Sequence, residues 1–144
     1  MHTYKHKLSI ITKTVFSFFC VCIISCAYAQ KTAIDFFNFG YSQVEQQNYV
    51  KAIEFYNKAI ELDSTMVNAY YNRAIANIYL EKLPESLVDL NKAVEMKPDF
   101  AVALYKRGLV KYNLHKREDG CHDIDNARSL GWEDAETTYK EYCW

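Results

Sequence analysis

The sequence contains few of the residues that break helices: two prolines and four glycines among 144 residues. It also contains no stretch in which apolar and polar residues alternate in the manner of a half-buried strand. Apolar residues recur instead at helical spacing, as in Ile53, Tyr56 and Ile60. Pro84 lies at the expected start of a helix, where proline is tolerated, and Pro98 follows its expected end. These features predict an all-α fold.

An excess of positive charge is also absent. The segment 1–29 carries three lysines and no acid, and without it 14 basic side chains face 18 acidic ones, a formal charge of −4. Such a chain is a poor platform for phosphate backbones or anionic lipids, so we expect no nucleic-acid partner. Lys106, Arg107 and Lys111 form one small basic cluster. Its simplest interpretation is a solvated helix face with local ion pairs.

Catalytic and metal-binding motifs are missing as well. Beyond the segment 1–29 the chain has two histidines, His115 and His122, and none of the common hydrolase or phosphate-loop motifs. The acidic residues are interpreted as solvent-facing, with no pair of carboxylates placed in a pocket. Neighbours such as Cys121 and His122 point about 100° apart on a helix and cannot act together as nucleophile and base. The spacing of His115, Cys121, His122 and Cys143 matches no standard metal site. We therefore expect no enzyme activity, cofactor or metal.

The N-terminal region contains an apolar run, Val15 to Ile24, which is much shorter than the about 20 residues that span a bilayer. Lysines precede this run, and the small residues Ala27 and Ala29 follow it at the two positions of a cleavage site. This order predicts a signal peptide over residues 1–29, with Gln30 as the first mature residue. We expect export to the periplasm or cell envelope and no membrane insertion after cleavage.

A competing signal lies within the same region. The stretch "IISC", which ends at Cys26, resembles a bacterial lipobox and would make Cys26 a lipidated N-terminus. Periodic helical sequence begins near Thr32, which would leave a lipid-anchored chain almost no tether. Simple export is therefore favoured, and a lipid-anchored envelope component remains the alternative.

Three consecutive segments of equal length, 33–66, 67–100 and 101–134, align with one another without gaps. Each segment is predicted to form two helices. Two columns of the alignment contain only small residues, Gly40/Ala74/Gly108 and Ala52/Ser86/Gly120. A third column contains bulky apolar residues, Tyr56/Leu90/Ile124. Small residues let the two helices of a hairpin approach closely, and bulky residues fill the space between successive hairpins, which cannot bury their apolar faces alone.

These columns resemble those of the tetratricopeptide repeat (TPR) family. The stretch "FNFGYSQVEQQNYVKAIEFYNKAIELD" carries the small and aromatic residues of the family's pattern, namely Gly40, Tyr49, Ala52, Tyr56 and Ala59. The resemblance extends over residues 30–144, and it is weakest in the third repeat, where Gly120 replaces the usual alanine. It implies a helix-turn-helix solenoid of three repeats, closed by a capping helix at about 133–143.

The resemblance also implies a concave groove, lined by the first helices, that holds a peptide or helix of a protein partner. By repeat position, the residues of this predicted groove are Phe37, Tyr41, Val44, Asn68, Tyr71, Asn72, Ile75, Ile78, Val102, Tyr105, Lys106, Leu109 and Tyr112. The column Phe37, Tyr71 and Tyr105 is aromatic in all three repeats. It can serve as a binding wall or as packing, and the sequence leaves both interpretations open.

One subclass of the family grips the C-terminal carboxylate of chaperone tails with Lys, Asn and Arg side chains. The equivalent positions here are Phe37, Tyr41, Asn72, Val102 and Lys106. Only Asn72 matches, and Lys106 keeps the charge without the arginine fork. That ligand class is therefore not expected here.

Two cysteines remain in the mature chain, Cys121 and Cys143, and an even pair in an exported protein suggests a disulfide. The repeat frame places Cys121 in an apolar column that faces the final helix. Residues equidistant from a turn lie level in an antiparallel pair, and Trp132 is the midpoint of the two cysteines. We predict a disulfide that staples the final helix to the array, with His122 directed toward solvent. The oligomeric state stays open.

Overall fold

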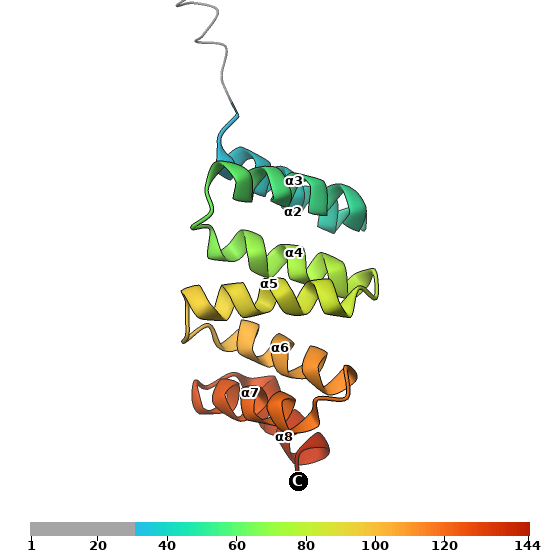
Figure 1. Ribbon diagram of the computed structural model, residues 1–144, viewed down its shortest axis with the longest axis vertical. Helices are drawn as coiled ribbons and strands as arrows, with labels where there is room; N and C mark the ends of the chain where they lie inside the picture. The colour runs from blue at the N-terminus through green and yellow to red at the C-terminus, as the bar shows by residue number, and fades with distance from the viewer. Residues whose placement is uncertain (1–30) are drawn as a thin grey trace, which may run out of the picture. The chain divides into compact units, whose positions relative to one another are not determined.

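The computed structural model describes residues 31–144, so the predicted signal peptide, Cys26 and Gln30 lie outside the described residues (Figure 1). Within the described residues the chain is helical and contains no strand, which confirms the all-α prediction. The helices are α2 (Ala33–Glu45), α3 (Tyr49–Leu62), α4 (Val67–Tyr79), α5 (Leu83–Met96), α6 (Ala101–Asn113), α7 (Arg117–Ser129) and α8 (Glu133–Tyr142).

The helices form three hairpins, α2–α3, α4–α5 and α6–α7, each of which lies against the next (Figure 1). Their first helices begin at Ala33, Val67 and Ala101, which are the first residues of the three aligned segments. Helix α8 follows the third hairpin and contacts α7. The architecture is therefore the helix-turn-helix solenoid that the sequence predicts.

The same turn closes every hairpin. Gln47, Glu81 and His115, which occupy equivalent positions of the three repeats, have φ angles of 59°, 58° and 60°. A left-handed conformation costs a residue other than glycine of order 1–3 kcal/mol. It lets the following N–H turn back onto the helix end, as where Asn48 donates to the carbonyl of Gln43 at 2.8 Å. Carbonyls that the helix end leaves open are thereby satisfied.

Small residues set the spacing of the two helices in the third hairpin. A Cβ atom on Gly108 would lie 2.7 Å from the carbonyl oxygen of Gly120, and a Cβ on Gly120 would lie 2.7 Å from that of Gly108. The two backbones are thus in direct contact, as the small columns predict. In the first hairpin, Gly40 leaves room for a ring, since its Cβ would lie 2.6 Å from Tyr56 Cε1.

The bulky column forms the centre of the core. Tyr56, Leu90 and Ile124 are fully buried, one in each repeat. Burying a large apolar side chain stabilises the fold by about 1.5–3 kcal/mol. Ala135 of α8 belongs to the same core as Leu90 and Ile124, so α8 covers apolar surface that the third hairpin would otherwise expose.

The hydroxyl of Tyr56 yields a testable prediction, because Tyr56 Oη is buried without a hydrogen-bond partner among the described residues. The substitution Tyr56→Phe removes this unsatisfied group and keeps the ring. We expect it to raise the free energy of unfolding at neutral pH by about 1 kcal/mol in urea titrations. The matched control is Tyr105→Phe, which should lower stability because Tyr105 Oη lies 3.0 Å from Thr138 Oγ1.

Comparison of wild type with Tyr56→Phe also gives a pH test. Burial, and secondarily Tyr41, raises the pKa of Tyr56 to about 12. An unfolded tyrosine loses its proton near pH 10, so between about pH 10 and 12 the unfolded state binds fewer protons and stability falls. We expect wild type to lose up to about 3 kcal/mol more than Tyr56→Phe over this range. Equal losses in the two proteins would contradict this assignment.

Candidate functional site

The predicted groove residues lie on the three first helices, α2, α4 and α6. Most of them are half-buried, including Phe37, Tyr71 and Ile75. Tyr41 is the most open of the large ones, with 52% of its surface exposed. The helices α2 and α4 therefore present aromatic and aliphatic side chains that are held by packing yet remain partly accessible.

Each member of the aromatic column packs on another ring. The ring centroids are 5.8 Å apart for Phe37 and Tyr56, and 5.2 Å apart for Tyr71 and Phe100. These contacts support the interpretation that the aromatic column contributes to packing. They also fix the ring orientations, which lowers the entropy cost of presenting the exposed edges to a partner.

The third repeat differs because α8 covers part of its face. Tyr105 is only 9% exposed, and its ring centroid lies 6.3 Å from that of Trp132. Tyr112 packs edge-to-face on Tyr142, with centroids 5.2 Å apart. Lys106 Nζ lies 5.5 Å from the centre of the Tyr105 ring. The accessible part of the predicted groove is therefore concentrated on α2 and α4.

An aromatic pair that the sequence reasoning missed extends this surface. Tyr49 and Tyr79 stack at 4.6 Å with their planes 9° apart, and Tyr79 is 60% exposed. Burial, with a smaller contribution from Tyr79, raises the pKa of Tyr71. The pair joins the first hairpin to the C-terminal end of α4.

The interpretation of the basic cluster as a solvated face is wrong for Arg107 and Lys111. Arg107 donates to both carboxylate oxygens of Asp123, at 2.7 and 2.6 Å, and Lys111 Nζ lies 2.8 Å from Asp123 Oδ2. Asp123 is only 1% exposed, so not every acidic residue faces solvent. Two cations surround this carboxylate because a buried charge must be compensated.

The second repeat contains the same arrangement. Arg73 donates to the Asp89 oxygens at 2.8 and 2.6 Å and to Asn57 Oδ1 of the preceding hairpin at 2.6 Å. In the third repeat Arg107 likewise reaches Asn91, at 3.4 Å. The signal was present in the sequence, because an asparagine, an arginine and an aspartate follow one another at the same regular interval in both places.

The structure joins Cys121 and Cys143 by a disulfide with Cα atoms 5.5 Å apart, as the repeat frame predicts. Arg117 adds a hydrogen bond to the carbonyl of Tyr142 at 2.8 Å. His122 is exposed and lies 3.2 Å from the Asn126 amide. The Cys–His stretch thus attaches α8 to α7.

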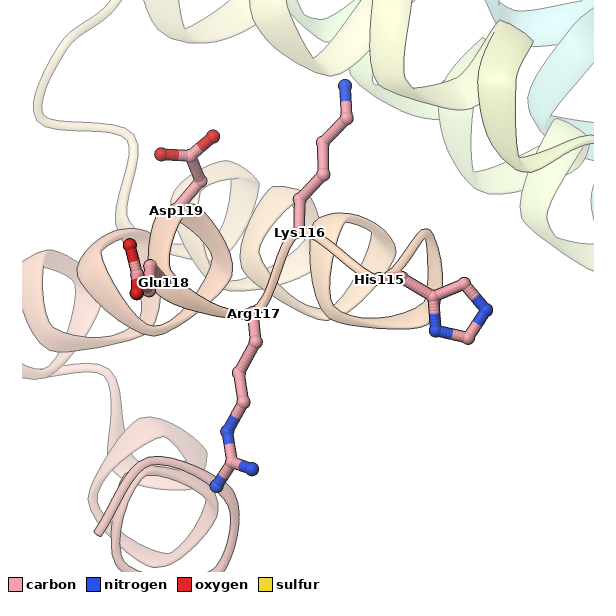
Figure 2. Close-up of a pocket in the computed structure, with 5 residues that line it drawn as sticks. All are labelled: His115, Lys116, Arg117, Glu118 and Asp119. Atoms are coloured by element: carbon pink, nitrogen blue, oxygen red, sulfur yellow. The ribbon is translucent and has the colours of Figure 1, made fainter.

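The turn before α7 forms a shallow pocket lined by residues 115–119. Figure 2 shows that its side chains diverge: His115 and Lys116 extend away from each other, and Arg117 points toward α8. No group of three or more His, Cys, Asp or Glu side chains within the described residues could hold a metal ion. This turn offers no converging set of catalytic groups.

Among the described helices, none has the length and apolar character needed to cross a membrane.

Comparisons with known proteins agree with this fold. The TPR repeat family model matches residues 40–78. The chain is 33% identical over 60 residues to an NADPH oxidase activator from Dictyostelium discoideum, which covers 42% of this chain and only 10% of that protein. The described fold is similar to the first TPR of Spaghetti (RPAP3) bound to the HSP90 peptide SRMEEVD. That match has a TM-score of 0.74 at 25% identity and covers 77% of this chain and 90% of the other.

The Arabidopsis OM64 TPR domain is similar to the same extent, with a TM-score of 0.74 at 23% identity over 77% of this chain and 93% of that domain. This second likeness concerns the fold alone. Together with the three hairpins in phase and the buried column at their centre, these matches show that residues 31–144 have the fold of a TPR domain and that residues 40–78 match the TPR repeat model.

Proposed function

We propose that the chain is a non-enzymatic interaction module whose predicted groove binds an apolar segment of another protein. The supporting observation is the partly exposed aromatic and aliphatic surface on α2 and α4, around Tyr41, Tyr71 and Ile75. Rigid aromatic side chains are frequent anchors at protein interfaces. TPR domains similar to this chain are described as bound to HSP90 or HSP70 peptides, which supports a peptide or protein as the ligand.

In this proposal the ligand is less acidic than the HSP90 and HSP70 peptides. Phe37, Tyr41 and Val102 occupy positions where a carboxylate clamp would need polar or basic groups, and Lys106 lies over the Tyr105 ring. A peptide such as SRMEEVD brings several carboxylates and would find few cations to pair with them. An uncharged segment with aliphatic or aromatic anchors fits the surface better.

A peptide-display selection against the purified protein tests this proposal. We expect selected segments to be apolar and to bind at least about a hundredfold more tightly than SRMEEVD in fluorescence anisotropy, because each unpaired carboxylate costs binding energy. Tyr41→Ala should weaken the selected peptide by about tenfold or more. The matched control is Leu62→Ala on α3, where an exposed apolar side chain lies outside the predicted groove. Equal binding of SRMEEVD, or equal effects of the two variants, would contradict the proposal.

The second part of the proposal is that the protein acts in the periplasm or cell envelope. It is supported by the order of lysines, apolar run and small residues in the segment 1–29. The intact mass of the protein recovered from an exporting host distinguishes a chain that begins at Gln30 from one that begins at an acylated Cys26. We expect the former, and recovery of an uncleaved chain would refute export.

A further inference from the structure

A polar notch lies on the side of α4 that faces away from the predicted groove. It has a volume of about 340 Å³ and is lined by side chains of α3, α4 and α5, with Asn57, Arg73, Asn77 and Asp89 among them. Successive residues of a helix are rotated by about 100°, so Arg73 and Asn77 are each about 160° from the groove residue Ile75. The notch is therefore separate from the surface proposed above.

One polar group in this notch has no partner within the chain. Asn77 is only 6% exposed, and its side-chain amide makes no hydrogen bond to any residue that the structure describes. The atoms of its side-chain amide are nevertheless not fully shielded from solvent, so they reach the open space of the notch. A ligand that enters the notch can bond to this amide without breaking any hydrogen bond among the described residues.

The third repeat shows what a closed version of this notch looks like. Lys111 stands one repeat further along the chain, at the position equivalent to Asn77. Its Nζ atom bonds to Asp123 at 2.8 Å, so the side chain is satisfied internally. In the second repeat, Asp89 is bound by Arg73 alone among the cations, and the amide of Asn77 remains available. The second and third repeats thus have the same helix arrangement at this place. They differ in that Lys111 has a partner within the described chain and the Asn77 side chain has none.

The charges in the open notch cancel. Arg73 is neutralised by Asp89. The lining also contains one further cation, Lys82, and one further anion, Glu85, both of which are exposed. The remaining features are two amides, Asn57 and Asn77, and an apolar border that includes Val88, which is 67% exposed. Such a site carries no net charge and offers both a donor and an acceptor beside apolar surface.

We propose that this notch binds a primary amide side chain, asparagine or glutamine, carried on a segment of a protein partner. A primary amide donates and accepts at once, so it pairs with the Asn77 amide through two hydrogen bonds. The methylene stem of the ligand lies along Val88 and Ile53, both of which border the notch. The site gives the protein a second point of attachment, on the opposite side of α4 from the predicted groove.

The experiment follows the side-chain NH₂ signals of ¹⁵N-labelled protein, expressed from the full sequence, in ¹H–¹⁵N spectra. The probe is N-acetyl-glutamine methylamide, and the comparison probes are the corresponding glutamate and lysine derivatives and free L-glutamine. We expect saturable shifts of the Asn57 and Asn77 signals with the blocked glutamine probe. Each comparison probe should bind at least about fivefold more weakly, because its charged groups lose hydration on entering a notch without net charge.

The variant Asn77→Lys installs the residue that the third repeat carries at this position, so the fold should tolerate it. We expect it to weaken the glutamine probe by at least about tenfold, since the open amide is replaced by an internally bonded lysine. The matched control is Lys111→Asn, which leaves the Asn77 notch intact and should not weaken the probe. The proposal is overturned by absence of a saturable shift, by unchanged binding in Asn77→Lys, or by equal binding of the glutamate or lysine derivative.

Discussion

Replacing Cys143 by alanine should lower the free energy of unfolding by about 3 kcal/mol. The disulfide joins residues that are 22 positions apart, and a closed loop of this length restricts the unfolded chain by about that amount. The loss should be concentrated at the C-terminal end, because α8 contacts the rest of the chain chiefly through α7. Terminal elements fray unless they are tied down.

Guanidinium titration of wild type and Cys143→Ala, each with and without a reducing agent, measures this effect. Reduction should bring wild type close to the variant and leave the variant unchanged. Thr137→Ala, a change on the same helix away from the disulfide, serves as the control and should stay within about 0.5 kcal/mol. If wild type unfolds at the same denaturant concentration with and without reductant, the disulfide does not stabilise the array.

The second large effect is expected for Asp123→Ala, which should cost about 3–5 kcal/mol. The carboxylate of Asp123 is buried, and it accepts bonds from Arg107 and Lys111. Its removal leaves two partly buried cations without compensation. Urea unfolding at neutral pH measures the loss. Asp125→Ala provides the control, because the Asp125–Arg128 pair lies at the surface, where an ion pair contributes about 0–1 kcal/mol.

The first hairpin suggests a further check on this interpretation. Where the second repeat has Arg73 and Asp89, the first has Phe39 and Phe55, whose ring centroids are 5.7 Å apart. The double replacement Arg73→Phe/Asp89→Phe should therefore cost less than Asp89→Ala alone, since it removes both charges together. A larger loss in the double variant would mean that packing, rather than charge compensation, dominates at this position.

The periodic part of the structure could be predicted from the sequence, because it depends on columns of residue size. Tyr56, Leu90 and Ile124 share one column and are all buried, and the small residues Gly108 and Gly120 meet as expected. The disulfide followed from the same frame, because antiparallel helices place residues equidistant from the turn at one level. In each case a one-dimensional pattern was enough.

The remaining features depend on how helices rotate and tilt. Charged residues are usually exposed, so composition alone did not indicate that Arg107 and Asp123 meet across two helices. The repeated spacing of asparagine, arginine and aspartate carried that signal, but spacing does not show that the carboxylate is buried. Tyr105 shares a column with the accessible Tyr71, but α8 lies over it, and the angle at which that helix returns is not encoded by the repeat. The stacked pair of Tyr49 and Tyr79 likewise joins residues of different hairpins and different columns.

The Asn–Arg–Asp arrangement gives the array a direction. Each arginine bonds an aspartate of its own hairpin and an asparagine of the hairpin before it. The middle hairpin takes part in both contacts: its Arg73 bonds to Asn57 of the first hairpin, and its Asn91 accepts a bond from Arg107 of the third. Tandem duplication of residues 67–100 would therefore recreate the Asn–Arg–Asp bonds at the new junction. The first hairpin contributes Asn57 but has phenylalanine at the positions equivalent to Arg73 and Asp89. The middle hairpin is thus the unit by which this protein could be lengthened.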